Sequence, residues 1–289
     1  MKIATKKYLA EEGARVRLKD WPTRVQPVCE SEEAYRELLA KHVARLSDLQ
    51  ELLYASNRYS LLLVFQGMDT SGKDGVIKHV MTGVNPQGCR VTSFKHPSGT
   101  ELEHDFLWRT TRELPERGRI GIFNRSYYEE VIVVRVHPEL LRSEGLPDAS
   151  TRNAKVWHAR YESINGLENH LSRCGTRVVK FFLHLSKEEQ RKRLLARIDE
   201  REKHWKFQAT DIEERNHWRD YMDAYSRCIE ATSMRDAPWY IVPADDKPTA
   251  RLIVSQVIAE TLEALDMHYP ELDADEARNL ASFRAALQR

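Results

Sequence analysis

The sequence contains few of the residues that would indicate a secreted, zinc-binding or membrane protein. Its four cysteines, Cys29, Cys89, Cys174 and Cys228, lie far apart and form no C-x-x-C pair. Thiols scattered in this way fit a reducing compartment and disfavour zinc. A membrane-spanning helix needs about eighteen consecutive apolar residues, and no such run occurs. The N-terminus also lacks the apolar run that is typical of a secretory signal. We therefore expect a soluble, cytoplasmic protein with no membrane partner.

An excess of charge of one sign is also missing. The 289 residues include 45 Lys and Arg against 44 Asp and Glu, a net charge of +1. A nearly neutral chain has no overall field that attracts polyanions, so any basic site must be local. Arginines and aromatic residues form no nucleic-acid-binding pattern, so we expect no nucleic-acid partner. The absence of H-E-x-x-H and of G-x-S-x-G likewise disfavours a histidine metal site and a hydrolase.

Short apolar runs alternate with helical patterns along the chain, and this alternation predicts the fold class. Apolar runs that read as buried strands occupy residues 60–66, 90–94, 119–124, 177–185 and 239–243. Helical patterns begin at a Ser31 cap and at a Thr100–Glu103 capping box, and they cover 151–174, 212–232, 250–265 and 275–287. Strands alternating with helices favour an α/β fold, a parallel five-stranded sheet flanked by helices.

Three parts of the chain differ in character. Residues 1–30 lack periodicity and are net basic, so we expect an extended arm, or simply a solvated tail. Residues 31–270 read as one domain, with no linker or repeat. Residues 271–289 contain a last helix with a polar face, which we expect to pack on a partner.

A phosphate-binding loop follows the first predicted strand. Residues 67–75 read GMDTSGKDG, a G-x-x-x-x-G-K pattern with a strand before it and a helix after it. Gly67 and Gly72 let the backbone curl so that N–H groups point at an anion, and Lys73 would reach over the phosphates. A chance glycine-rich turn is the alternative. The residues expected to form this cradle are Gly67, Thr70, Ser71, Gly72, Lys73 and Asp74.

The loop departs from the usual motif in its acidic residues. Asp74 stands where a Ser or Thr would bind Mg²⁺, and Asp69 places a second carboxylate inside the loop. Since an anion there would repel a triphosphate unless a metal bridged them, we expect Asp69 to hold Mg²⁺, or Mn²⁺ in its place, together with phosphate oxygens. The substitution indicates an unusual phosphate site.

A polar segment follows the third predicted strand, where open α/β sheets place functional groups. Asn124 ends this strand in the position where many such enzymes have Asp, and Arg125 follows it. We expect Arg125 to neutralise a transferring phosphoryl group and Asn124 and Glu129 to lie on one side of the site. A buried-edge Asn, a surface Arg and a first-turn helix Glu are the structural alternatives.

The segment after the fourth strand is cationic. Residues 187–206 contain eight Lys and Arg against five Asp and Glu, and the helical pattern breaks at 199–206. We expect a lid over about 187–211 whose cations close over phosphate; the alternative is a solvated charged helix. The candidate lid cations are Arg193, Arg197, Lys203 and Lys206.

Three segments together resemble the polyphosphate kinase 2 family of polyphosphate:nucleotide phosphotransferases: GMDTSGKDG (67–75), FNRSYYEEVIVVRVHPE (123–139) and RIDEREKHWKF (197–207). KHPSGTELEHDFLWR and VPADDK are similar to the same family, so the resemblance spans roughly residues 20–270. It implies a thymidylate-kinase-like P-loop core with a helical lid and Mg²⁺-dependent, reversible phosphate transfer between inorganic polyphosphate and nucleotides.

The resemblance also implies roles and partners. Asp69 and Lys73 would serve the phosphate loop, Arg125 the second motif, and the four lid cations the polymer. With Asn in FNRSYYE, the chain resembles the subgroup, class III, that accepts both AMP and ADP. The implied partners are polyphosphate, adenine or guanine nucleotides, and further copies of the chain in a homodimer or homotetramer. A kinase that uses a nucleoside triphosphate, and a regulator that binds polyphosphate or nucleotide without turnover, remain as alternatives.

Overall fold

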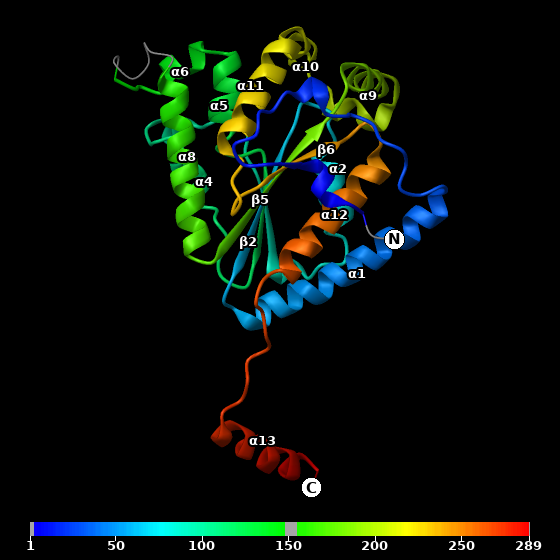
Figure 1. Cartoon of the computed structure of the whole chain (residues 1–289), viewed down its shortest axis with the longest axis vertical. Helices are drawn as coiled ribbons and strands as arrows, with labels where there is room; N and C mark the ends of the chain where they lie inside the picture. The colour runs from blue at the N-terminus through cyan, green and yellow to red at the C-terminus, as the bar shows by residue number, and fades with distance from the viewer. Residues whose placement is uncertain (1–2, 148–154, 289) are drawn as a thin grey trace.

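A six-stranded sheet forms the centre of the chain in the computed structural model, which describes residues 3–147 and 155–288 (Figure 1). The strands are β1 (Leu9–Ala10), β2 (Ser60–Gln66), β3 (Cys89–Ser93), β4 (Ile120–Asn124), β5 (Thr176–His184) and β6 (Trp239–Pro243), in the order β1-β6-β5-β2-β4-β3. β2 to β6 are parallel, which confirms the predicted five-stranded parallel sheet. The antiparallel β1 makes the sheet mixed and was not predicted, because two residues show no periodicity.

The central strand β2 is buried on both faces, as its apolar run predicts. Successive side chains of a strand point to opposite faces. Leu61, Leu63 and Phe65 accordingly pack in one core, and Leu62 and Val64 pack in the other. A parallel strand with two apolar faces needs helices on both sides of the sheet.

Two groups of helices provide these layers (Figure 1). One face is covered by α1 (Glu32–Ser56), α2 (Lys73–Val80) and α12 (Lys247–Glu263). The other face is covered by α5 (Glu129–Val136), α8 (Lys155–Arg173) and α11 (Trp218–Thr232). Ser31 caps α1 as predicted, accepting a hydrogen bond from the Ala34 N–H. The first residues of the predicted helix 151–174 lie outside the described residues.

Short elements connect these layers and correct two expectations. They are η1 (Thr5–Tyr8), η2 (Leu18–Asp20), η3 (Pro86–Gly88), α3 (Gly99–Leu102), α4 (Trp108–Thr111), α6 (Glu139–Ser143), α9 (Lys187–Asp199), η4 (Arg201–Lys206), α10 (Thr210–Glu214) and η5 (Arg215–His217). The capping box at α3 joins Ser98 and Glu101, not Thr100 and Glu103, so α3 starts earlier and ends before Trp108. The expected helix 212–232 is divided into α10, η5 and α11.

The N-terminal arm lies against the sheet edge. β1 pairs with β6, the Val16 N–H donates to Glu230, and Ala10, Val16 and Leu18 are buried. The described part of the arm is therefore docked and is not a solvated tail.

The last helix, α13 (Ala274–Leu287), lies apart from the remainder of the chain (Figure 1). An Asp273–Glu276 capping box begins it, and Leu280, Phe283 and Leu287 are exposed. Among the residues that the structure describes, none of the helices is long and apolar enough to cross a bilayer.

Candidate active site

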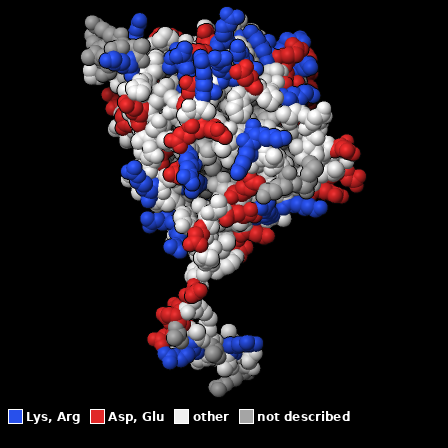
Figure 2. Space-filling view, viewed as in Figure 1, with Lys and Arg blue, Asp and Glu red and all other residues white. Residues whose placement is uncertain are grey.

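The carboxyl ends of the parallel strands bring three connections to one edge of the sheet, around a cavity of about 420 Å³ that we call the phosphate cavity. The loop after β2, the start of the turn after β4 and the segment after β6 all line it, together with α9 and η4. Its lining contains eight Lys and Arg and three Asp, so its walls are strongly cationic. Figure 2 shows Lys and Arg side chains gathered at the end of the molecule where α9 and α10 lie.

The loop at residues 67–75 has the backbone that a phosphate cradle needs. Gly67 (φ +151°) and Gly72 (φ +99°) adopt conformations that favour glycine. A Cβ at Gly67 would lie 2.7 Å from Ser71 Oγ and 3.0 Å from the Leu183 carbonyl oxygen. Thr70 is left-handed (φ +64°), which is strained for a residue with a side chain. The loop thus holds a high-energy conformation at the floor of the cavity.

Lys73 begins α2 and lies across this loop. Its Nζ donates to the Gly67 carbonyl at 2.7 Å and is 3.5 Å from the Met68 carbonyl. Since an ammonium has three donors, one remains for a phosphate oxygen. Burial and then the charge of Arg125 lower the pKa of Lys73 to about 8, against the opposing effect of nearby carboxylates. Lys73 is therefore mostly charged at neutral pH, and its pKa lies only about one unit above that pH.

Two side chains of α9 hold the loop from behind. Arg193 donates to the carbonyls of Thr70 (3.0 Å) and Ser71 (3.2 Å) and also to those of Ala244 and Asp245 after β6. The buried Gln190 donates to the Asp69 carbonyl at 3.1 Å. The structure thus places Arg193, expected as a lid cation, against the loop with its guanidinium bound to backbone oxygens, and Arg193 also lines the phosphate cavity.

Arg125 joins the loop to the turn after β4. Its NH2 donates to Asp69 Oδ1 at 3.0 Å, and its NH1 lies 3.7 Å from Glu129 Oε2. These carboxylates, Glu129 first, raise the pKa of the guanidinium. Arg125 is left-handed (φ +65°), the second strained non-glycine residue of the site. The structure thus brings Asp69, Arg125 and Glu129 together.

Asn124 has a partner that the sequence did not indicate. Its Nδ2 donates to Asp74 Oδ1 at 2.6 Å, so the two unusual residues of the motifs contact each other. Asn124 lines the phosphate cavity, whereas Glu129 lines a different cavity. Arg125 lines both cavities, but Asn124 and Glu129 do not share one, contrary to the expectation that they lie on one side of the site.

The other three candidate lid cations also line the phosphate cavity. Arg197 donates to Asp211 Oδ2 at 3.0 Å and to the Lys206 carbonyl at 3.1 Å, tying α9 to η4 and α10. Lys203 is paired with Glu200. Lys206 Nζ lies 4.9 Å from the centre of the exposed Trp205 ring.

Two cations that the sequence interpretation missed also line the phosphate cavity, namely Lys247 and Arg251 of α12. They are four residues apart and share one face of the helix. Burial, followed by the charges of Arg193 and Lys203, lowers the pKa of Lys247. The available signal was their position directly after the fifth predicted strand, because all parallel strands end at the same edge.

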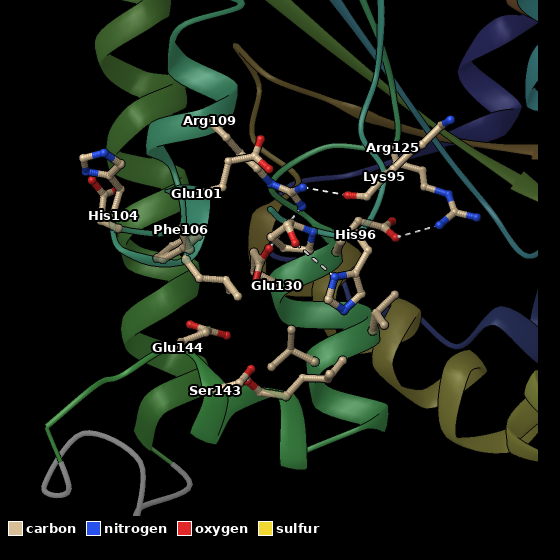
Figure 3. Close-up of a pocket in the computed structure, with 17 residues that line it drawn as sticks. Lys95, His96, Glu101, His104, Phe106, Arg109, Arg125, Glu130, Ser143 and Glu144 are labelled. Atoms are coloured by element: carbon tan, nitrogen blue, oxygen red, sulfur yellow. Dashed lines mark hydrogen bonds and ion pairs between the residues drawn. The ribbon is translucent and has the colours of Figure 1, made fainter. Parts of the chain in front are cut away.

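A second cavity, of about 150 Å³, adjoins the first (Figure 3). Arg125 lines both cavities. The lining combines apolar side chains such as Leu102 and Phe106 with charged ones. Arg109 donates to the Lys95 carbonyl at 2.7 Å and to Glu130 at 3.3 Å. Eleven of its seventeen lining residues are charged or polar, so the second cavity combines apolar contacts with many hydrogen-bonding groups.

Glu130 is a buried carboxyl in the wall of the second cavity. It is buried between Arg109 and Arg160, and its Oε2 lies 3.7 Å from Arg160. Burial first, and the neighbouring Glu144 next, raise the pKa of Glu130 to about 7, although both arginines lower it.

The donor atoms at the loop fit a hard divalent cation. Asp69 contributes a partly exposed carboxylate, and Thr70 Oγ1 and Ser71 Oγ are buried with no hydrogen-bond partner among the described residues. These are oxygen donors, which Mg²⁺ and Mn²⁺ prefer. The described residues contain no group of three or more His, Cys, Asp or Glu side chains placed to hold a metal, so phosphate oxygens would complete the coordination.

The fold and the site together define a P-loop phosphotransferase of the kinase type. The family profile of polyphosphate kinase 2 matches residues 29–270, and the chain belongs to this family.

Individual relatives agree with this assignment. The chain is 64% identical to an ADP-polyphosphate phosphotransferase of Rhodopseudomonas palustris over 99% of both chains. It is 43% identical to an AMP/ADP-polyphosphate phosphotransferase of Meiothermus ruber over 92% of this chain and 96% of that protein. The crystal structure of polyphosphate kinase 2 from Arthrobacter aurescens matches with a TM-score of 0.84 at 39% identity, covering 96% of this chain and 98% of that one.

Proposed function

We propose that this chain transfers phosphate between inorganic polyphosphate and nucleotides, converting ADP to ATP and AMP to ADP in reversible reactions. The observation that carries the proposal is that two cavities of different chemistry meet at Arg125. The phosphate cavity, cationic and open along α9 and α12, suits a polyanion. The second cavity, smaller and partly apolar, is proposed to hold part of the nucleotide. Family membership supports the same pair of substrates.

The reaction needs no nucleophilic side chain. An oxygen of the nucleotide's terminal phosphate forms a bond to the terminal phosphorus of the polymer, and the bond from that phosphorus to the next bridging oxygen breaks. The electron pair stays on the shortened polymer, so the charges balance without a proton transfer. Lys73 and the loop N–H groups hold the donor phosphate, and Arg125 neutralises the group in transit.

A divalent cation, Mg²⁺ or Mn²⁺, would be held by Asp69 with phosphate oxygens. Bound there, it would neutralise charge on the phosphoryl oxygens. Asp69 also accepts from Arg125, so one carboxylate would keep the cation and the guanidinium on the same phosphate. Lys203, Lys206, Lys247 and Arg251 extend the cationic wall away from the loop and are proposed to contact further phosphates of the polymer.

The choice of acceptor is proposed to include AMP, since the names of similar proteins cover both ADP and AMP/ADP. Asn124 leaves the strand tip without a carboxylate and instead binds Asp74. One negative charge fewer at this point would let the shorter AMP phosphate approach the donor.

Assembly into a homodimer or homotetramer is proposed from α13. The cytoplasm is proposed as the location because the four cysteines are free. Leu280, Phe283 and Leu287 have helical spacing and are exposed, so a second copy would cover them. Removal of residues 271–289 should lower the mass measured by light scattering, while an unchanged mass would contradict this assignment.

The donor distinguishes this proposal from a kinase that uses a nucleoside triphosphate. ADP and Mg²⁺ are incubated with the protein and either polyphosphate or GTP, at matched total phosphate, and ATP is measured. We expect ATP with polyphosphate and none with GTP. ATP from GTP alone would instead support the triphosphate-dependent kinase. Tight polyphosphate binding with no turnover would support a regulator.

A further inference from the structure

Two neighbouring tyrosines of the turn after β4 converge on one buried carboxylate. Tyr127 and Tyr128 follow Arg125 closely in the chain, and both hydroxyls donate to Glu168 Oε1, each at 2.8 Å. Glu168 belongs to α8, forty residues further along the chain from Tyr128. All three side chains are completely buried, so the turn is fixed to α8 at a point where water has no access.

Glu168 is held in turn by a lysine from the centre of β5. Lys180 Nζ donates to Glu168 Oε2 at 2.5 Å and to the Thr232 carbonyl at 2.7 Å, and it is fully buried. Three donors therefore meet the two oxygens of Glu168, which is the bonding pattern of an ionised carboxylate. Burial raises the pKa of Tyr127 and Tyr128 well above the ordinary value, so both remain donors.

The anchored turn carries the strained residue of the site. Arg125 keeps its left-handed conformation beside Ser126, whose Oγ accepts from the Gln66 side chain and from the Tyr128 N–H, each at 3.2 Å. A left-handed non-glycine residue persists only where its surroundings determine it from several sides. Two adjacent side chains held by one oxygen restrict the rotation of the turn, and the direction of Arg125 depends on that rotation.

Stability alone does not account for this arrangement. A buried ion pair is weak evidence for stability, because well-packed apolar residues of similar volume often serve as well or better. The surroundings are otherwise apolar and aromatic, with Tyr128 and Trp239 rings 4.8 Å apart and the Lys180 ammonium 5.5 Å from each. Hydrogen bonds between polar groups in such a core fix the orientation of the side chains, which apolar packing alone does not.

We propose that Glu168, held by Lys180, is a positioning residue for phosphoryl transfer: through the hydroxyls of Tyr127 and Tyr128 it aims Arg125 at the phosphoryl group. Glu168 touches no substrate. The inference rests on the proposed function, because it assigns Arg125 to the phosphoryl group that passes between the two cavities.

A double-mutant cycle tests this inference. Tyr127→Phe/Tyr128→Phe removes both hydroxyls and keeps both rings, and the pair is made in the wild-type protein and in an Arg125→Lys protein. In the wild type we expect kcat to fall at least about tenfold with a polyphosphate KM within about twofold, because orientation is lost and binding is not. In the Arg125→Lys protein we expect a fall of less than about twofold, since the effect passes through Arg125.

Tyr161→Phe is the matched control. Tyr161 is also buried on α8, but its hydroxyl accepts from Arg135 at 3.4 Å and belongs to no contact with Glu168. It should keep wild-type kcat. If the double Phe variant does not fold, the Tyr127→Phe and Tyr128→Phe single variants enter the same cycle.

The outcomes separate the inference from the function on which it rests. An unchanged kcat in the wild-type background, or equal losses in both backgrounds, overturns the positioning role. A wild-type protein without phosphotransfer overturns the proposed function itself, whereas an active wild type with no coupling overturns only the inference.

Discussion

Removal of the Arg193 guanidinium tests what maintains the strained phosphate loop. The side chain is nearly buried and donates to four carbonyl oxygens, two in the loop (Thr70 and Ser71) and two after β6 (Ala244 and Asp245). Losing the partner of a buried polar group costs about 1–3 kcal/mol. Because water can enter the space left by Arg193→Ala and bind the carbonyl groups, the low end of this range applies. The four hydrogen bonds to carbonyl groups, at about 1 kcal/mol each, predict a loss of at least about 4 kcal/mol in the free energy of unfolding. The substitution also removes the hydrogen bond from Arg193 Nε to Glu189 Oε1 (3.0 Å).

This loss is measurable by thermal and urea unfolding. For a chain of this length, about 4 kcal/mol corresponds to a fall of about 10 °C in Tm. The loop should also lose its conformation at Thr70, so kcat should fall even at temperatures where the protein is folded. Arg193→Lys should recover little, because an ammonium cannot span the four carbonyl groups.

Lys203→Ala is the control, since Lys203 lines the same cavity but pairs only with Glu200 on the surface. It should keep the wild-type Tm and weaken polyphosphate binding. The reasoning is refuted if Arg193→Ala keeps the wild-type Tm and loses polyphosphate affinity, because Arg193 would then act as a lid cation.

Further predictions concern charge and metal. The pH dependence of kcat/KM reports groups of the free enzyme. For polyphosphate, kcat/KM should be constant below the Lys73 pKa of about 8 and fall above it as the ammonium is lost, and Lys73→Arg should extend the constant region to higher pH. Identical pH profiles of the two proteins would show that Lys73 is not the group that titrates. Polyphosphate affinity should fall more steeply with salt than nucleotide affinity, and equal slopes would mean that the cavity cations do not follow the polymer. Asp69→Asn should lose most activity with unchanged circular dichroism and need more Mg²⁺; near-wild-type turnover would refute the metal assignment. Asn124→Asp places a carboxylate against Asp74 and should lower AMP turnover relative to ADP, and Glu129→Ala should also change this ratio; if both keep the wild-type ratio, acceptor choice lies elsewhere.

Most of the sheet was predictable because its strands are apolar on both faces. The limits of β2 and β6 agree with their apolar runs, β4 begins one residue later than its run, and β3 and β5 both begin and end one residue earlier. β1 was not predictable, since its pairing depends on where the arm folds back. The capping box failed for a related reason: both Ser98–Glu101 and Thr100–Glu103 fit the motif, and only tertiary contacts select one.

The site was predictable where a sequence motif determines the backbone conformation. It was less predictable where the role of a side chain depends on which groups the fold brings beside it. Glycine spacing indicated the loop, and Asp69 and Lys73 of this loop line the phosphate cavity. Charge counting along residues 187–206 indicated a cationic lid, yet it did not distinguish Arg193, which binds carbonyl groups, from Lys203, which pairs with Glu200. The sequence analysis assigned no role to Lys180 in the buried run 177–185, and its partner Glu168 is identified only by the fold.

Direct transfer from polymer to nucleotide is tested most directly by ³¹P NMR of ADP, polyphosphate and Mg²⁺ with the wild-type protein and with Lys73→Ala. We predict that the γ-phosphate of ATP appears in step with the loss of polymer phosphate, with no free phosphate formed, and that Lys73→Ala loses this signal while keeping its circular dichroism. Free phosphate without ATP, or a Lys73→Ala protein that makes ATP at the wild-type rate, would contradict the account.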